Sequence, residues 1–342
     1  MDLKSDDEKL NELFNTKETT DFGKTIKKAK VFSILRTVIL SLMIVIILSF
    51  TLLVTNASML NKIANQKERN LRNWYTIGLP NAFMGNVQFD DKIMTGEIDY
   101  VRYRFLGNKP VVDGNYKKDY KYVPLINGVY GDISNHLYAS NYKTQQDLDE
   151  TINYNKDGKR VMRFYHPSVK YDKYPNDLVA IDKVGSNKLV ELAISFDKAY
   201  TLDKVKEMFP NEVTLNWYWV DTYNEKDLTK DVPIEKGKSV EINSVFEENN
   251  VYGIKALDGQ GNKIDNPEGD FINTITIVSK DKNSSSIYKE LFNKLSEGKG
   301  EIKKENLKII GVVVSGDTDS LKKLKNQNYI KAATLGATAD KY

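Results

Sequence analysis

The sequence predicts a single-pass membrane protein whose larger, C-terminal part is an α+β region outside the membrane. Three observations predict this class. Among the 342 residues, one uncharged apolar segment lies near the N-terminus, basic residues gather on its N-terminal side, and two β-α-β patterns occur toward the C-terminus. The chain has no Cys and only two His, which excludes disulfide scaffolds, thiol nucleophiles and histidine-rich metal sites.

The apolar segment over Thr37–Val54 contains no charge, Pro or Gly, and Arg36 is the only charge in residues 31–54. A bilayer core of roughly 30 Å needs about 20 apolar helical residues. We therefore predict a transmembrane helix over residues 31–54, with the long side chain of Arg36 reaching the lipid headgroups.

Basic residues predict the orientation of this helix. Residues 22–36 contain no acid. The basic residues on the other side of the span begin further from it, and the acid Glu68 lies between them. The bias favours a cytoplasmic N-terminus, an extracytoplasmic C-terminal domain and an uncleaved anchor in the cell membrane; a cleaved signal peptide is the alternative. The residues that give this topology signal, and that we expect to contact anionic lipid of the bilayer, are Lys24, Lys27, Lys28, Lys30 and Arg36.

The cytoplasmic tail, residues 1–30, contains the pattern of a short amphipathic helix. Ser5-Asp6-Asp7-Glu8 matches a capping box, and Leu10, Leu13 and Phe14 follow at helical spacing on one face. A helix this short is marginal in water, so its apolar face is a candidate partner-binding surface. A solvated tail that contacts nothing is the alternative.

After the span we expect a helical stalk over residues 55–78, ended by Gly78 and Pro80. Residues 79–187 then form a β-rich, Tyr-rich module. Its tyrosines predict half-buried sheet surface, with a platform for a ligand or glycan as the sharper alternative. The expected strands are Val87–Phe89, Ile98–Phe105 and Lys121–Leu125, and Gln145–Thr151 is expected to begin a helix whose acids face solvent.

Residues 188–342 contain the two β-α-β patterns, which predict an α+β sandwich with a ferredoxin-like fold as one candidate. The first has strands at Leu189–Phe196 and Glu212–Val220 around a helix that Thr201 can cap. The second has strands at Leu307–Val314 and Tyr329–Leu335 around a short helix. Between them, Asp258-Gly259-Gln260-Gly261 predicts a hairpin turn, and Phe271–Leu295 is mostly helical with a polar break at Asp281–Ser286.

No catalytic or cofactor motif is present. The chain lacks a Walker loop, a G-x-S-x-G elbow and a dinucleotide fingerprint. His136 and His166 lack metal-ligand spacing and are expected to be structural or surface residues. With 50 Lys and Arg against 47 Asp and Glu, the chain has no general basic field. The sequence therefore predicts no enzyme, no cofactor, no metal and no nucleic-acid partner.

Several segments together resemble the sigma-factor regulator family, typified by membrane-bound anti-sigma factors of Gram-positive bacteria. They are the charged tail and Lys-rich flank, Leu79-Pro80-Asn81, Val190–Thr201 (VELAISFDKAYT), Leu215–Trp219 (LNWYW), Gly311–Gly316 (GVVVSG), Leu321–Leu324 and Ile330–Gly336. Residues 90–175 are the least similar part.

The resemblance implies that the protein holds an extracytoplasmic-function sigma factor at the membrane through its tail and releases it on envelope stress. However, residues 1–30 are shorter than a typical sigma-wrapping domain and lack the His and Cys ligands of zinc anti-sigma folds. The implied partners are therefore a sigma factor or a second membrane anti-sigma subunit. The alternative is a cell-envelope interaction module that binds wall polymer or another membrane protein without a transcriptional role.

Overall fold

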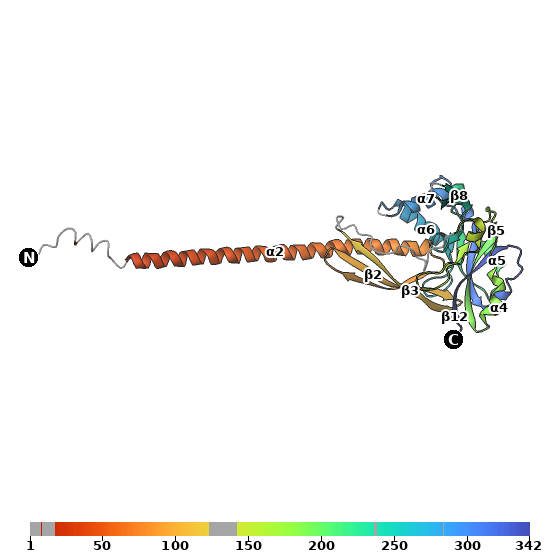
Figure 1. The fold of residues 1–342 in the computed structure, drawn as a ribbon, viewed down its shortest axis with the longest axis horizontal. Coiled ribbons are helices and arrows are strands. Elements are labelled where there is room, and N and C mark those ends of the chain that lie inside the picture. The colour runs from red at the N-terminus through yellow and green to blue at the C-terminus, as the bar shows by residue number, and fades with distance from the viewer. Residues whose placement is uncertain (1–7, 9–17, 123–141, 236–237, 283) are drawn as a thin grey trace, which may run out of the picture. The chain divides into compact units, whose positions relative to one another are not determined.

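The structure is a computed structural model that describes residue 8 and residues 18–122, 142–235, 238–282 and 284–342 (Figure 1). Its contacts divide the chain into two compact units, Met1–Asn61 and Lys62–Tyr342. The helix α2 extends over Glu18–Ile77 and contributes residues to both units.

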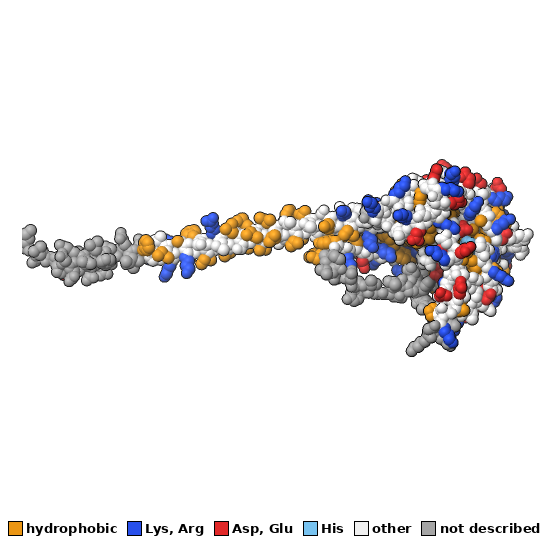
Figure 2. Space-filling view, turned by 90° about the horizontal axis from the view of Figure 1, so that it is seen from above, with side chains coloured by type: hydrophobic (Ala, Val, Ile, Leu, Met, Phe, Trp, Pro, Cys, Tyr) orange, Lys and Arg blue, Asp and Glu red, His pale blue; other side chains and the backbone are white. Residues whose placement is uncertain are grey.

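The part of α2 in the first unit is apolar and uncovered. Its most apolar window has a mean hydropathy of 2.8 and no buried residue, and Figure 2 shows hydrophobic side chains along the helix. The hydroxyl group of Thr51 donates to the carbonyl oxygen of Ile47 at 2.8 Å, so this polar side chain is satisfied within the helix. Within the described residues, α2 is the one helix long and apolar enough to cross a membrane.

A three-stranded antiparallel sheet follows α2 in the second unit. It consists of β1 (Phe83–Asp91), β2 (Thr95–Leu106) and β3 (Lys109–Lys121), in that order. Buried residues alternate along β2, and Tyr100 meets Tyr75 of α2 edge-on with ring centroids 5.8 Å apart. The predicted strands Val87–Phe89 and Ile98–Phe105 lie within β1 and β2. The third expected strand, Lys121–Leu125, begins where β3 ends, and residues 123–125 lie outside the described residues.

The C-terminal sheet has five strands in the order β10-β6-β11-β5-β12, and every neighbouring pair is antiparallel. Each β-α-β unit therefore places a strand of the other unit between its own two strands. The first unit is β5 (Lys188–Tyr200), α5 (Leu202–Met208) and β6 (Thr214–Val220); the second is β11 (Ile309–Asp317), α8 (Thr318–Lys322) and β12 (Ile330–Asp340); β10 (Gly253–Lys255) is added at the β6 edge.

The side chains of β5 contribute to cores on both faces of this sheet. Val190, Leu192, Ile194 and Phe196 pack in a large apolar cluster with α4 (Ile181–Val184), α5, α6 (Pro267–Lys280), α7 (Ser286–Leu295) and α8. On the opposite face, Ala193 packs in a cluster with Trp217, Trp219, Phe164 and Phe246, and the last two belong to the paired strands β4 (Arg163–Phe164) and β9 (Phe246–Glu247). Both faces of β5 are therefore buried.

The remaining elements include one that the sequence did not indicate. The hairpin of β7 (Thr229–Glu235) and β8 (Lys238–Asn243) was not predicted, because its strands carry many charges and Pro233. The other elements are α3 (Gln145–Glu150) and 3₁₀ turns at Asp177–Val179, Glu225–Asp227 and Lys304–Asn306.

Helix α3 confirms the expected helix start but corrects the placement of its acids. Asp149 is 1% exposed, and its carboxylate accepts hydrogen bonds from the Lys173 backbone N–H at 3.0 Å and from Gln145 Nε2 at 2.7 Å. Burial raises the pKa of Asp149. This acid therefore fixes the backbone at Lys173 and does not face solvent, whereas Asp147 caps the helix on its exposed side.

Candidate functional site

A buried turn joins the end of α2 to both sheets. At Leu79-Pro80-Asn81, Leu79 and Asn81 adopt φ of 44° and 48°, a left-handed conformation that Asn tolerates better than most residues. Asn81 is fully buried. Its amide group donates to the carbonyl oxygen of Phe105 at 2.8 Å and to Glu191 Oε1 at 2.7 Å. The turn thus binds β2 and β5 through one side chain.

Polar residues around this turn form what we call the junction cluster: Asn81, Arg104, Asp113, Glu191, Asn216, Glu248 and Ser315. Arg104 of β2 is its centre. The side chain is 4% exposed and pairs with three carboxylates: Asp113 at 2.8 Å, Glu191 at 3.1 Å and Glu248 at 2.9 Å. A guanidinium group has enough donors in one plane to serve several carboxylates at once.

Further hydrogen bonds extend the cluster into the C-terminal sheet. Ser315 Oγ of β11 donates to Asn216 Oδ1 of β6 at 2.7 Å, and Asn216 Nδ2 donates to Asn81 Oδ1 at 3.2 Å. The backbone N–H of Ala337 in β12 donates to Glu191 Oε2 at 3.0 Å. The cluster therefore joins the turn after α2, strand β2 and four strands of the C-terminal sheet.

The two buried carboxyl groups Glu191 and Asp113, both paired with Arg104, have pKa values shifted in opposite directions. Burial raises the pKa of Glu191, and Arg104, the Ala337 N–H and Asn81 offset this only in part. Burial also acts to raise the pKa of Asp113, but Arg104 and Arg102 outweigh it and hold that pKa below its ordinary value. The ionised state of the carboxyl groups in the cluster thus depends on Arg104 and on the neighbouring Arg102.

Asp113 connects the junction cluster to a neighbouring pocket. Its carboxylate also pairs with Arg102 Nε at 2.6 Å, and the Arg102 guanidinium lies over the ring of Tyr116, 4.4 Å from its centroid. Arg102 and Tyr116 both line the pocket. A series of contacts, Arg102–Asp113–Arg104, therefore links the pocket to Glu191 on β5 of the C-terminal sheet.

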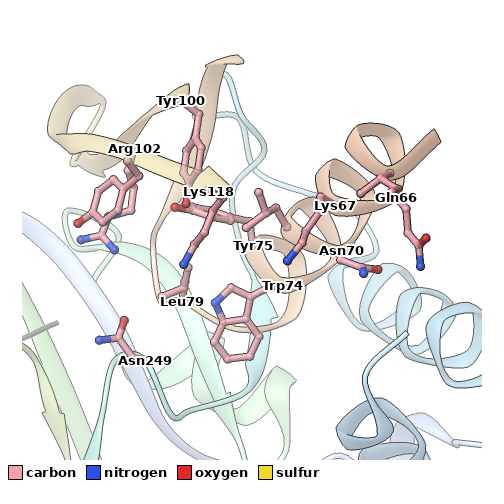
Figure 3. Close-up of a pocket in the computed structure, with 13 residues that line it drawn as sticks. Gln66, Lys67, Asn70, Trp74, Tyr75, Leu79, Tyr100, Arg102, Lys118 and Asn249 are labelled. Atoms are coloured by element: carbon pink, nitrogen blue, oxygen red, sulfur yellow. The ribbon is translucent and has the colours of Figure 1, made fainter. Parts of the chain in front are cut away.

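The pocket, here named the α2–β3 pocket, has a volume of about 520 Å³ and lies wholly within the second unit (Figure 3). Its walls come from α2, from β2 and β3, and from Asn249. Aromatic, amide and basic side chains dominate the lining, and none of the lining residues is an acid. The lining consists of Ile63, Gln66, Lys67, Asn70, Leu71, Trp74, Tyr75, Leu79, Tyr100, Arg102, Tyr116, Lys118 and Asn249.

The tyrosines of this pocket are held neutral. Burial raises the pKa of Tyr75 and of Tyr100, and their hydroxyl groups are hydrogen-bonded to each other. Burial likewise raises the pKa of Tyr116 to about 12. The charge of the pocket at neutral pH is therefore set by Lys67, Lys118 and the paired Arg102.

The residues that the sequence singled out lie elsewhere. Leu10, Leu13 and Phe14 lie outside the described residues. The five basic residues of the predicted topology signal all lie exposed on α2: Lys24, Lys27, Lys28, Lys30 and Arg36. Of the two histidines, His136 is outside the described residues, and His166 is 3% exposed among Trp219, Tyr223 and Phe246.

Two family profiles match the chain. The Sigma factor regulator N-terminal profile matches residues 23–111, and the Sigma factor regulator C-terminal profile matches residues 181–337. Together these ranges cover more than half of the chain. The chain belongs to the sigma-factor regulator family. No curated protein and no solved structure matches it.

Membership gives the chain a role in sigma-factor regulation and implies interaction with a sigma factor. The junction cluster lies where the two matched regions meet: Asn81 and Arg104 belong to the N-terminal match, and Glu191, Asn216 and Ser315 to the C-terminal match. The segments around Asn81, Glu191, Asn216 and Ser315, far apart in sequence, supplied motifs of the resemblance, and here they share one buried network with Arg104.

Sequence reasoning missed the charged half of this network. A signal was present in Ile98–Phe105, because Arg102 and Arg104 continue, at spacing of two, the strand face that carries Ile98 and Tyr100. Arginines on the apolar face of a strand indicate buried acids opposite them. Nothing local indicated which acids, since Asp113, Glu191 and Glu248 come from three separate segments.

Proposed function

We propose that this chain is a membrane-anchored, non-catalytic regulator of an extracytoplasmic-function sigma factor, acting as an anti-sigma factor or as a subunit of an anti-sigma complex. The observation that carries the proposal is the match of both regulator regions in a chain whose helix α2 contains a long apolar segment with no buried residue. A helix with exposed apolar side chains needs a lipid or protein environment.

In this proposal residues 1–30 lie in the cytoplasm and the region after the span lies outside the cell membrane. The basic residues on the N-terminal side of the span support this orientation. Treatment of intact cells with protease tests it: the C-terminal region should be cleaved while a tag at the N-terminus stays protected. Protection of the C-terminal region would refute the orientation.

The tail is proposed to contact the sigma factor, or a second membrane subunit, through Leu10, Leu13 and Phe14. We expect Leu13→Asp, like deletion of residues 1–21, to raise transcription from a promoter of the cognate sigma factor, because a charge on the apolar face disrupts docking. Asn15→Asp is the matched control. It introduces the same side chain on the opposite face of the expected helix, and it should leave transcription unchanged.

Equal membrane levels of all variants, measured by blotting, make the comparison valid. Unchanged transcription in both the Leu13→Asp and the deletion strains would contradict a role for the tail and favour a cell-envelope interaction module. Co-purification of the sigma factor with the parent chain from detergent extracts is the direct check of the partner.

For the C-terminal sheet we propose a ferredoxin-like architecture with one added strand. Support comes from the order β6-β11-β5-β12, from its antiparallel pairing, and from α5 and α8 connecting alternate strands. An experimental structure with both helices on one face of this sheet would establish it, and helices on opposite faces would refute it.

A further inference from the structure

The lining of the α2–β3 pocket contains basic side chains and no acid, and none of the sequence motifs of the family resemblance includes these basic residues. Lys67 comes from α2 and Lys118 from β3, and both side chains are exposed. Within the described residues neither ammonium group has an ion-pair or hydrogen-bond partner, although many other exposed lysines of the second unit are paired with acids. Two cations facing one pocket without an acid favour an anion between them.

Figure 3 shows the side chains of Lys67 and Lys118 extending to the same side of the pocket, toward the indole of Trp74. The Trp74 ring packs edge-on against the ring of Tyr252, with the two ring centroids 5.6 Å apart. A side chain at position 78 would collide with the indole, so the absence of a side chain at Gly78 allows the ring to occupy this position. Trp74 is thus a fixed aromatic surface next to two cations.

The remaining polar lining suits a ligand that both donates and accepts hydrogen bonds. Asn70 and Asn249 contribute amide groups, each of which can donate and accept. A volume of about 520 Å³ holds one or two sugar rings, and it is too small for a folded peptide element. Aromatic surface with nearby amides is suited to a ring that has an apolar face and hydroxyl groups.

We propose that the α2–β3 pocket binds a small anionic sugar, with its carboxylate or phosphate group between Lys67 and Lys118 and its ring against Trp74. The proposal deepens the proposed function, because such a ligand would supply the external region with a signal. Arg102 lines the same pocket and pairs with Asp113. A bound anion therefore also contacts the series of ion pairs that leads to Glu191.

Calorimetric titration of the full chain in detergent micelles tests the binding without a sigma factor. The probes are N-acetylmuramic acid for a carboxylate, N-acetylglucosamine 1-phosphate for a phosphate, and neutral N-acetylglucosamine and inorganic phosphate as controls. We expect at least one acidic sugar to bind about tenfold or more tightly than either control, with an affinity that falls as salt rises.

Variants identify the site. Lys67→Ala and Lys118→Ala should each weaken binding about tenfold, because each removes one charge-assisted hydrogen bond. Arg69→Ala and Lys117→Ala remove the same charge from the neighbouring positions outside the lining and should leave the affinity unchanged.

Three results would overturn the proposal: no binding of either acidic sugar, binding of neutral N-acetylglucosamine or inorganic phosphate as tight as that of the acidic sugars, or an equal loss of affinity in the control and lysine variants. Failure of the sigma-factor assays with intact sugar binding would instead refute the proposed function and leave the pocket assignment standing.

Discussion

Replacing Arg104 by Met tests the energetic role of the junction cluster. Arg104 pairs with three buried carboxylates, and Met fills a similar volume without donating a hydrogen bond. Removing one partner of a buried ion pair costs about 3 to 5 kcal/mol, because a charge is left unpaired in a medium of low dielectric constant. Asp113 keeps Arg102 as a partner, and Glu191 keeps Asn81 and the Ala337 N–H. We therefore expect a loss of about 4 kcal/mol in the free energy of unfolding.

The loss should depend on pH. The pKa of Glu191 is already raised by burial, and Arg104 is the largest influence that lowers it. The folded pKa of such a carboxyl group lies above its unfolded value of 4.5, so the folded chain holds the proton more tightly. Its contribution to stability is fully present below pH 4.5 and is lost as the pH rises through the folded pKa. The free energy of unfolding of Arg104→Met should consequently be closer to that of the parent chain at pH 5 than at pH 8.

Urea unfolding of the full chain in detergent micelles measures this effect, because the buried Trp217 and Trp219 report on the C-terminal sheet by fluorescence. Arg72→Met is the matched control. It breaks an exposed pair with Glu68 one turn away on α2, so it should cost roughly 0.5 kcal/mol. A cost below about 1 kcal/mol for Arg104→Met at pH 8, or an equal cost at both pH values, would refute the reasoning.

Three further substitutions test other parts of the fold by the same unfolding assay. Gly253→Ala should cost at least about 2 kcal/mol, because a Cβ would collide with the carbonyl oxygen of Tyr218; a neutral result would contradict the packing of β10 on β6. Burial lowers the pKa of Lys255 from 10.5 to about 7, so the unfolded chain binds more protons between these values and stability rises with pH there. Lys255→Met should lack this rise in stability, and a pH profile identical to that of the parent chain would contradict the assignment of the rise to Lys255. Asp317→Ala should cost about 1 kcal/mol in the free energy of unfolding, because Asp317 accepts a hydrogen bond from the Ser320 N–H at the start of α8. Asp319→Ala, two residues further along and exposed, should cost less, and equal costs would contradict the role of Asp317 as the cap.

The elements with strong local patterns could be predicted from the sequence. Local pattern predicted β5 and β6, and Thr201 was correctly identified as the cap of α5. The polar break predicted at Asp281–Ser286 covers the gap between α6, which ends at Lys280, and α7, which begins at Ser286. The turn at Asp258 was also correct, since Leu257 pairs with Lys263 across it. These features depend on neighbours within a few residues.

Long-range features could not be predicted. In β5, Glu191 and Ser195 alternate with apolar residues, which is the ordinary pattern of a strand with one solvated face. Both residues are fully buried, because residues of β2, Tyr165 directly after β4, and the turn after α2 cover this second face. Local periodicity cannot distinguish a solvated polar face from a polar face buried against other charges. The α2–β3 pocket was hidden for the same reason, since its two lysines lie on separate elements.

The arrangement of the pocket and the junction cluster gives a physical reason for the family's long-range motifs. Trp74 and Lys67 lie on α2, the helix that also contains the apolar segment, so a ligand in the pocket contacts this helix directly. Arg102 and Asp113 connect the same pocket to Arg104 and Glu191, and Glu191 also holds the turn that ends α2 through Asn81. We therefore expect an anion bound in the pocket to act on the C-terminal end of α2 from two sides. We accordingly expect Arg104→Met, which interrupts only the buried route, to change the affinity for an acidic sugar in the same calorimetric titration, although Arg104 does not line the pocket.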